Sequence, residues 1–202
     1  MPYLENTHRK NETLRFSEDD ADWQGLGENV VLEGCELLLD LPAEEFVLSA
    51  GTRLVGCTIR AVRTFARTAW SAAWIEGCRF EGHFDDSDFG HAPWFDEPNL
   101  GGMKDCDFQN AQLSYCQFLS TDVRTLKLPA WPCFTLADPG ALRNIDLTLA
   151  PHDWGSFFGA ALDGPDELTA ASLRAEDVIE GHGGSLSELR AFIVATFPGS
   201  VL

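Results

Sequence analysis

Bulky apolar residues recur at a spacing of five along the middle of the chain. One series runs through Phe108, Leu113, Phe118, Val123 and Leu128, and the residue two positions before each is mostly small. A helix repeats its apolar positions every three or four residues and a strand every two, so neither explains this spacing. The pattern predicts extended segments of about five residues separated by turns, with the bulky and the small residue facing inward.

A longer repeat contains the short one. Similar segments begin at successive steps of 22, 21, 28, 20 and 19 residues, at positions 32–37, 54–59, 75–80, 103–108, 123–128 and 142–147. Four sides of about five residues account for a step near 20, so successive turns of chain would stack as strands at ~4.8 Å with equivalent residues in ladders. The long step predicts an insertion loop near 90–102.

Some of these segments follow a recognisable five-residue motif, small–Asp/Asn–Leu/Phe–x–x. Cys-Asp-Phe-Gln-Asn at 106–110 and Thr-Asp-Val-Arg-Thr at 121–125 match it, as does Ser-Asp-Phe at 87–89. The chain therefore resembles the pentapeptide-repeat family over roughly residues 30–147. The resemblance implies an all-β fold, a right-handed quadrilateral β-helix. Arg63 at a small inward position, Trp70 at a central one and the absence of repeats at 38–48 predict local bulges or loops.

The ends of the chain depart from the repeat, which suggests three parts. Residues 1–29, which include Trp23, are expected to form an N-terminal cap segment, and residues 30–150 the repeat. In residues 151–202 a capping box at 185–188 precedes a helix, and a weaker helix is expected at 165–174. This short C-terminal helical segment would either cap the last turn or form a homodimer contact, as in some members of the family that the chain resembles.

The charge balance excludes some classes of partner. The chain has 14 basic and 32 acidic residues, a net charge of −18 that is spread along its whole length. Such a chain is not expected to bind nucleic acid directly or to bind anionic membranes. No apolar stretch approaches the length of a membrane span, and the first residues do not resemble a secretory signal. We expect a cytoplasmic protein.

The six cysteines follow the repeat. Cys35, Cys57, Cys78 and Cys106 are equivalent positions, and Cys116 occupies the small inward position of its own five-residue unit. Buried free cysteine behaves as a small apolar residue. We expect structural thiols, with stacked disulfides or a metal site as the alternatives.

Candidate chemistry is sparse. Nucleophile-elbow, phosphate-loop, dinucleotide and zinc-protease motifs are all missing from the sequence. His83, Asp85, Asp86, Asp88 and His91 are metal-ligating residue types, but their spacing fits no metal motif. We expect no catalytic residue, no metal and no cofactor; an enzyme would need a buried cluster such as His83 with Asp86.

Residues 46–80 reverse the charge of the chain, with Glu76 as their only acid. The arginines there are either ordinary solvated side chains or a basic strip that faces an acidic partner. Large aromatics in the insertion and at one outward position add candidate anchors. The partner-binding candidates are Arg53, Arg60, Arg67, Trp74, Arg79, Trp94 and Phe95.

These features favour a non-enzymatic, protein-binding solenoid, because a rigid rod offers a preorganised surface. By analogy with small acidic bacterial binding proteins, the most specific hypothesis is an immunity-type protein that binds a toxin or other protein partner. The alternative is a DNA-mimicking pentapeptide-repeat protein that protects a type II topoisomerase. The arginines interrupt the acidic surface that such a mimic needs.

Overall fold

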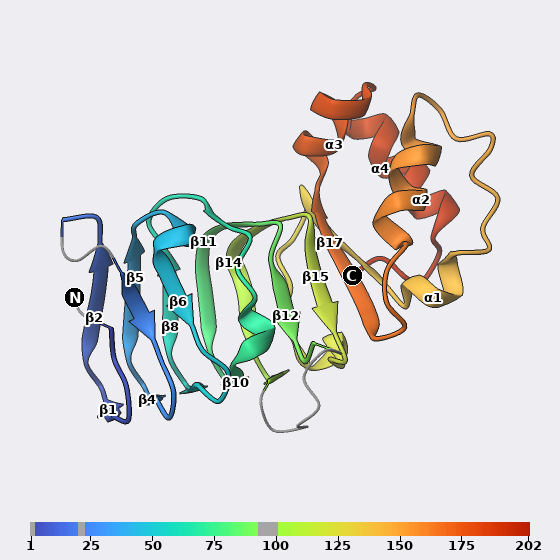
Figure 1. Cartoon of the computed structure of the whole chain (residues 1–202). Helices are drawn as coiled ribbons and strands as arrows, with labels where there is room; N and C mark the ends of the chain where they lie inside the picture. The colour runs from blue at the N-terminus through green and yellow to red at the C-terminus, as the bar shows by residue number, and fades with distance from the viewer. Residues whose placement is uncertain (1–2, 20–22, 93–100) are drawn as a thin grey trace.

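The computed structural model describes residues 3–19, 23–92 and 101–202. Most of the first two thirds of the chain forms strands stacked side by side, and the helices gather at the opposite end of the molecule from the N-terminus (Figure 1). The fold is therefore β-rich, with its helices in the C-terminal part.

One parallel sheet is built from strands that are one repeat step apart. In spatial order it contains β1 (His8–Lys10), β4 (Val31–Glu33), β7 (Arg53–Val55), β10 (Trp74–Glu76) and β13 (Gly102–Lys104). Leu32, Leu54, Ile75 and Met103 are direct partners along this sheet. These are the first residues of the repeated segments, so the predicted ladder is confirmed here.

A second parallel sheet follows the same steps. It contains β14 (Asp107–Ser114), β11 (Arg79–Asp85), β8 (Thr58–Ala61), β5 (Glu36–Asp40) and β2 (Thr13–Ser17), and β9 (Phe65–Ala66) also pairs with β11. Leu14, Leu37, Ile59 and Phe80 form its inward ladder. The pairing of β11 with β14 shifts register between Arg79 and Glu81.

The remaining strands form two smaller sheets. β3 (Gln24–Leu26) pairs with β6 (Phe46–Leu48), and the other sheet has the order β12 (Asp88–Gly90), β15 (Cys116–Leu119), β17 (Leu168–Arg174), β16 (Cys133–Ala137). Short 3-10 turns occur at η1 (Ala43–Glu45), η2 (Trp70–Ala72) and η3 (Val123–Thr125). β17 runs antiparallel to both of its neighbours.

The corner between the two large sheets needs a left-handed backbone. Gly34, Gly56 and Gly77 have φ of +62°, +61° and +61°, and Asn11 and Asp105 take φ of +54° at the same corner. Glycine reaches this region without steric cost, and Asn and Asp tolerate it better than other side chains. The repeated Gly-Cys pairs of the sequence are therefore the corner residue and the first inward residue after it.

The five-residue series points inward. Phe108, Leu113, Phe118 and Val123 are buried, and Leu128 is half-buried at the edge of the same core. The predicted inward orientation of this series is therefore confirmed.

The two predicted irregular positions behave differently. Trp70 is fully buried in η2, where its ring meets Phe65, Phe80 and Phe89, so the core accommodates this large central residue. Arg63 instead lies in an exposed turn and points outward.

Residues 1–29 contribute strands to the stack. β1 pairs in parallel with β4, β2 with β5, and β3 with β6. The sheets thus begin one step earlier than the predicted boundary at residue 30. Leu14 and Phe16 of β2 are buried and start the apolar core.

The C-terminal part contains α1 (Pro139–Leu142), α2 (Trp154–Leu162), α3 (Ala175–His182) and α4 (Leu186–Thr196) around a second core. α4 begins at the predicted capping box, where Ser185 accepts a hydrogen bond from the Glu188 backbone N–H. The helix expected at 165–174 is wrong, because residues 168–174 of that segment form strand β17. It forms backbone pairs on both sides, with β15 and β16, and this pairing overrides local helix propensity.

The position of β17 bears on the two roles considered for residues 151–202. β17 occupies the outer edge of β15 within the chain, so this part of the segment closes one end of the strand stack. A homodimer through the helices stays a prediction. In the insertion near 90–102, residues 93–100 lie outside the described residues.

Candidate partner-binding surface

The outer face of the β1–β4–β7–β10–β13 sheet carries the strongest candidate surface. Alternate residues of a strand face opposite sides, so the residues flanking the buried ladder point outward. One outward row contains His8, Val31, Arg53, Trp74 and Gly102, and the next contains Lys10, Glu33, Val55, Glu76 and Lys104. We name the region of Val31, Arg53, Val55 and Trp74 the Trp74 face.

The Trp74 ring lies over Gly102 of this sheet and is half-buried. A Cβ on Gly102 would come within 2.6 Å of the indole ring, so glycine at that position gives the ring its space. The Arg53 guanidinium lies 5.9 Å from the ring centroid, and the indole N–H donates to a Glu76 carboxylate oxygen at 3.4 Å. The ring is thus held in one orientation, with part of its surface open to solvent.

Ion pairs flank this apolar centre. The Glu33 carboxylate lies 2.7 Å from Lys10 Nζ and 2.9 Å from His8 Nε2, and Glu76 lies 3.9 Å from Lys104 Nζ. The hydrogen bond from Lys10 lowers the pKa of Glu33. Arg53 has no carboxylate partner among the described residues. A cation and an indole surrounded by satisfied polar groups are typical of the centre of a protein-binding surface.

On the second large sheet, Arg60 is paired with carboxylates of the same sheet. Arg60 lies between two carboxylates of neighbouring strands, 2.9 Å from Glu81 and 3.4 Å from Glu36. Exposed pairs of this kind contribute at most about 1 kcal/mol each, but they cancel the positive charge that a partner would meet. Arg60 is therefore a weaker contact candidate than its charge alone suggests.

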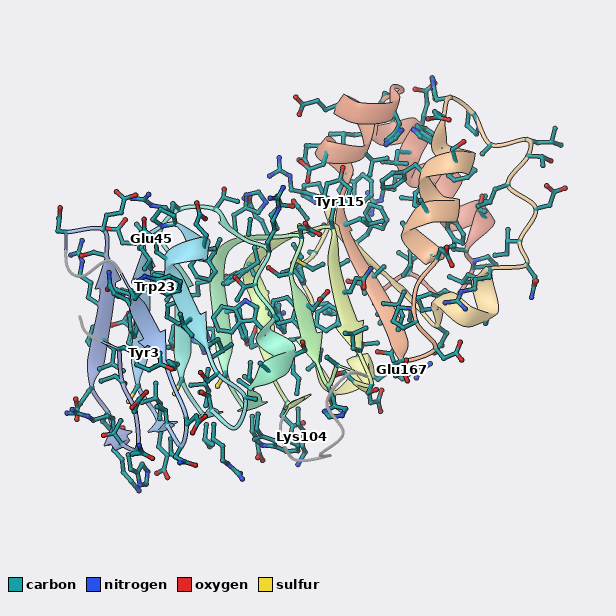
Figure 2. The ribbon with its side chains drawn as sticks, in the orientation of Figure 1. Tyr3, Trp23, Glu45, Lys104, Tyr115 and Glu167 are labelled. Atoms are coloured by element: carbon teal, nitrogen blue, oxygen red, sulfur yellow. The ribbon has the colours of Figure 1, made fainter. Side chains whose placement is uncertain are left out.

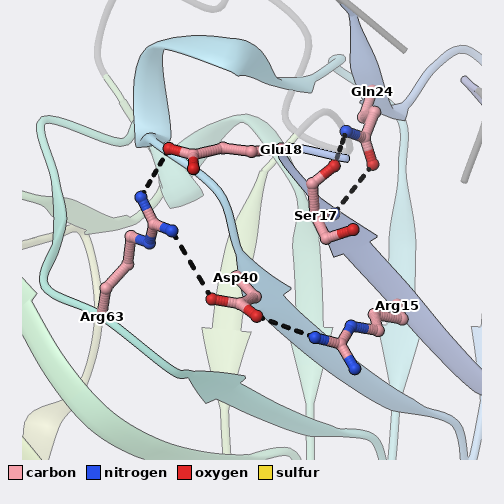
Figure 3. Close-up of polar contacts among 6 residues, drawn as sticks. All are labelled: Arg15, Ser17, Glu18, Gln24, Asp40 and Arg63. Carbon is pink, nitrogen blue, oxygen red and sulfur yellow. Dashed lines mark hydrogen bonds and ion pairs between the residues drawn. The ribbon is translucent and has the colours of Figure 1, made fainter. Parts of the chain in front are cut away.

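A chain of charges continues toward the N-terminal end (Figure 3). Arg15 lies 2.9 Å from one oxygen of Asp40, and Arg63 lies 3.7 Å from the other. Arg63 also pairs with Glu18 at 2.7 Å, and this contact raises the pKa of the arginine. The basic strip of residues 46–80 is thus largely paired with acidic residues of the same chain.

The remaining candidates are dispersed. Arg67 is highly exposed at 86%, adopts a left-handed backbone and lies 3.6 Å from Asp86. Arg79 points outward from β11 and has no ion-pair partner within the described part of the chain. Trp94 and Phe95 lie outside the described residues. Of the five candidates that lie in the described residues, the structure places Arg53 beside Trp74 and disperses the other three.

The histidine–aspartate segment does not form one cluster. His83 Nδ1 lies 3.2 Å from Thr64 Oγ1, whereas Asp86 pairs with Arg67. Burial raises the pKa of both Asp85 and Asp88. Within residues 3–19, 23–92 and 101–202, no group of three or more histidine, cysteine, aspartate or glutamate side chains could hold a metal ion.

His83 belongs instead to a chain of hydrogen bonds that sequence reasoning missed. Ser114 Oγ donates to Asp177 at 2.6 Å and lies 2.9 Å from His83 Nε2. The single hydroxyl proton goes to the carboxylate, so His83 must donate its own Nε2 proton to Ser114. Burial, followed by Arg174, lowers the pKa of His83.

The order of these three side chains does not suit nucleophilic catalysis. A serine nucleophile needs a histidine that accepts its proton, whereas here the serine stands between the histidine and the carboxylate. Ser114 is also buried. The group joins β11, β14 and α3, so its evident role is to attach the helical part to the strands. Asp177 is 63 residues from Ser114, and no motif in the sequence marks the contact.

All six cysteines lie in described parts of the chain and carry free, buried thiols. Three of those at the repeat positions donate to backbone carbonyls of the preceding step: Cys57 to Leu32 and Cys78 to Leu54, both at 3.4 Å, and Cys106 to Ile75 at 3.7 Å. Burial raises the pKa of Cys106 to about 11 and raises that of Cys116 further. The expected structural role of these thiols agrees with this arrangement.

Comparisons with family models, curated proteins and solved structures returned no match for this chain. None of the helices in the described residues combines the length and the apolar character needed to cross a bilayer.

Proposed function

We propose that this chain is a non-enzymatic protein-binding scaffold and that its Trp74 face contacts the partner. The observation that carries the proposal is the Arg53–Trp74 pair, a cation without a carboxylate partner among the described residues beside a half-buried indole. Tryptophan and arginine dominate binding energy at protein interfaces. Both side chains stand on a hydrogen-bonded sheet, so little conformational entropy is lost on binding.

For the scaffold we propose a right-handed quadrilateral β-helix of the pentapeptide-repeat type. Three observations support it: strands one repeat step apart pair in parallel and in register, the five-residue series is buried, and a left-handed corner recurs at Gly34, Gly56 and Gly77. Repeats that stack in this way bury a continuous core and leave every outward side chain available for recognition.

Within this class we propose an immunity-type protein that binds a bacterial toxin in the cytoplasm. The free thiols of all six cysteines support a reducing compartment. The net charge of −18 favours a basic partner overall, while Arg53 provides one site for a carboxylate. The toxin assignment itself is an analogy with small acidic binding proteins.

One observation favours a second candidate, a DNA mimic that protects a type II topoisomerase. The chain is strongly acidic, as such a mimic must be. However, Arg60 and Arg63 interrupt the acidic rows of the second large sheet. A surface of alternating sign reproduces duplex phosphates poorly.

The test begins with the partner. The protein is used as bait in an extract of its native host, and the product of the adjacent gene is tested for toxicity when it is expressed alone and together with this protein. The binding proposal expects Arg53→Glu and Trp74→Ala to weaken capture about tenfold or more. Arg124→Glu, the same charge reversal at an exposed arginine outside the Trp74 face, is the matched control.

The outcomes separate the candidates. Rescue from toxicity that is lost in Arg53→Glu but kept in Arg124→Glu supports the immunity role and the Trp74 face. Salt-sensitive inhibition of gyrase supercoiling, strengthened by Arg60→Glu, supports the DNA mimic instead. Capture that is unchanged in both Trp74-face variants refutes the assignment of this surface.

A further inference from the structure

The two ends of the strand stack differ. At the C-terminal end the outer edge of β15 is covered by β17 (Figure 1). At the N-terminal end β1 and β2 each pair with a strand on one side only, and no described strand lies beyond them. A strand edge of this kind presents unpaired backbone N–H and C=O groups, which another chain can bind.

The hydrogen bonds of β2 identify the groups that face outward. The Glu12 carbonyl accepts from the Glu36 backbone N–H at 2.9 Å, so residue 12 faces β5. Successive residues of a parallel strand turn their N–H and C=O to opposite sides. Thr13 and Arg15 therefore direct theirs away from β5.

The same reasoning applies to β1. The Thr7 carbonyl accepts from the Val31 backbone N–H at 2.9 Å, so residue 7 faces β4. His8 and Lys10 then direct their backbone groups toward the free edge. The edge thus offers outward peptide groups on both strands, on either side of the corner at Asn11.

The chain itself closes one position of this edge. Ser17 is the next outward-facing residue of β2, and its N–H donates to Gln24 Oε1 at 3.1 Å while its carbonyl accepts from Gln24 Nε2 at 2.6 Å (Figure 3). The buried side-chain amide makes both hydrogen bonds that a neighbouring strand would make. This cap fixes where an added strand must stop.

Basic side chains lie along the part of the edge that precedes the Gln24 cap. His8, Lys10 and Arg15 are the first members of three outward rows, and Lys10 and Arg15 each contact one carboxylate of the following strand, at 2.7 and 2.9 Å. Further along, Arg60 has carboxylates on both sides. An acidic residue on a strand added beside β1 would give Lys10 a carboxylate on each side, and one on a strand added beside β2 would do the same for Arg15.

Aromatic side chains are exposed at the same end. Trp23 is 67% exposed and Tyr3 is 37% exposed, and both lie near the first strands (Figure 2). Trp23 directly precedes the capping residue Gln24. These rings provide contact area beside a strand edge whose own inward residues, Leu14 and Phe16, are already buried.

We propose that the N-terminal edge of β1 and β2 binds an acidic, extended segment of a partner protein as an additional strand. A second copy of this chain is disfavoured, because two such edges would place basic residues against basic residues. The proposal concerns a surface separate from the Trp74 face and does not depend on it. Main-chain hydrogen bonds supply the affinity and Lys10 and Arg15 the preference for acidic residues.

The test uses a labelled peptide of about nine residues that alternates glutamate with threonine, and a matched peptide with glutamine in place of glutamate. Binding is measured by fluorescence anisotropy at low and at physiological salt. The proposal expects the glutamate peptide to bind about tenfold or more tightly than the glutamine peptide, with an advantage that shrinks as salt rises.

Two variants locate the site. Thr13→Pro removes an N–H that faces the free edge and leaves the bonds between β2 and β5 in place, so the fold should persist while peptide affinity falls about tenfold. Arg15→Glu should remove the preference for glutamate. Arg124→Glu, a similar reversal of an exposed, paired arginine outside this edge, is the control and should change neither. Circular dichroism verifies that each variant is folded.

Amide hydrogen exchange provides the second measurement. Added peptide should slow exchange at Lys10, Thr13 and Arg15 and leave the Trp74 face unchanged. Equal affinity for the two peptides, or full binding by folded Thr13→Pro, overturns the proposal. Sedimentation that shows a dimer of the free protein with these amides already protected also overturns it, since the occupant would then be a second copy.

This experiment is independent of the native partner. Loss of peptide binding in Thr13→Pro together with unchanged capture by Arg53→Glu would retain the edge site and reject the Trp74 face. The reverse pattern would reject the edge site alone.

Discussion

Replacing Phe108 with alanine tests how the core of the strand stack is built. Phe108 is fully buried in β14, and its ring stacks on Phe80 with 4.5 Å between centroids. Phe89 and Phe118 meet it edge to face at 5.2 and 5.6 Å. The substitution therefore removes a ring that three others contact, in an interior with few ways to collapse around the cavity.

The expected loss is large relative to total stability. Phe→Ala in a core costs about 3–5 kcal/mol, and each aromatic pair contributes about 0.5–1.5 kcal/mol beyond its area. Three such pairs place Phe108→Ala at about 5 kcal/mol, close to the lower end of the ~5–15 kcal/mol by which a typical domain is stable against unfolding. Leu128, the last residue of the same five-residue series, is half-buried, so Leu128→Ala should cost only about 1–2 kcal/mol.

Urea unfolding followed by circular dichroism measures both free energies. Phe108→Leu, with an expected loss of about 1–2 kcal/mol, extends the series if the alanine variant does not fold. The m-value should stay constant within the series, so that midpoint shifts report stability. A loss for Phe108→Ala no greater than that for Leu128→Ala would refute the inward orientation and the packing derived from it.

Three further predictions concern the corner, a buried carboxyl and the thiols. Gly77→Ala should lower stability by about 1–2 kcal/mol because of its left-handed backbone; Gly77→Asn should cost less, as Asp105 occupies the same corner, and thermal unfolding of both tests this. Burial raises the pKa of Asp88, so its carboxyl favours the fold at low pH and loses that contribution as pH rises through the raised pKa. Asp88→Asn should therefore gain stability over the parent at neutral pH, and a difference that does not vary with pH would contradict this cause. Cys106 and Cys116 should resist a thiol reagent in the native protein near neutral pH and react in denaturant, and rapid native modification would contradict their burial.

The sequence predicts the interior of the middle region well for a physical reason. Inward positions that recur at a fixed spacing can be predicted from that spacing alone, and Phe108, Leu113 and Phe118 are all buried as the spacing of five predicts. The pairing of Leu32 with Leu54 and Ile75 follows from the longer step in the same way. The two repeat lengths therefore predict most of the buried positions and strand pairings of the β-rich part.

The repeat does not predict the first strand, β1, or the last strand, β17. In β1 the ladder position held by Leu32 and Leu54 is occupied by Arg9, so the apolar signal is missing although the strand is present. Arg9 is half-exposed and pairs with Glu12 at 3.4 Å, and charged side chains on an edge strand are one way to avoid unwanted pairing. In β17 small residues such as Ala170 and Ala171 are compatible with a helix, and only the strands on both sides fix the extended form.

The candidate surface is predicted only in part. The partners of Arg60 lie 24 and 21 residues away at Glu36 and Glu81, which is one repeat step in each direction. A comparison of charged residues at equivalent positions of successive repeats would have identified both ion pairs from the sequence. The contact of Ser114 with Asp177 depends on how the helices pack on the strands, and no periodicity encodes it.

The direction of β17 limits how this molecule could have been lengthened. Each parallel strand offers its successor an edge of the same polarity, so duplication of a unit at the N-terminus or within the stack preserves the pairing rule. Beyond β15 the chain reverses direction, and a duplicated unit inserted there would meet an antiparallel neighbour. Descendants with more units should therefore retain this terminal strand unchanged and differ in the number of units that precede it.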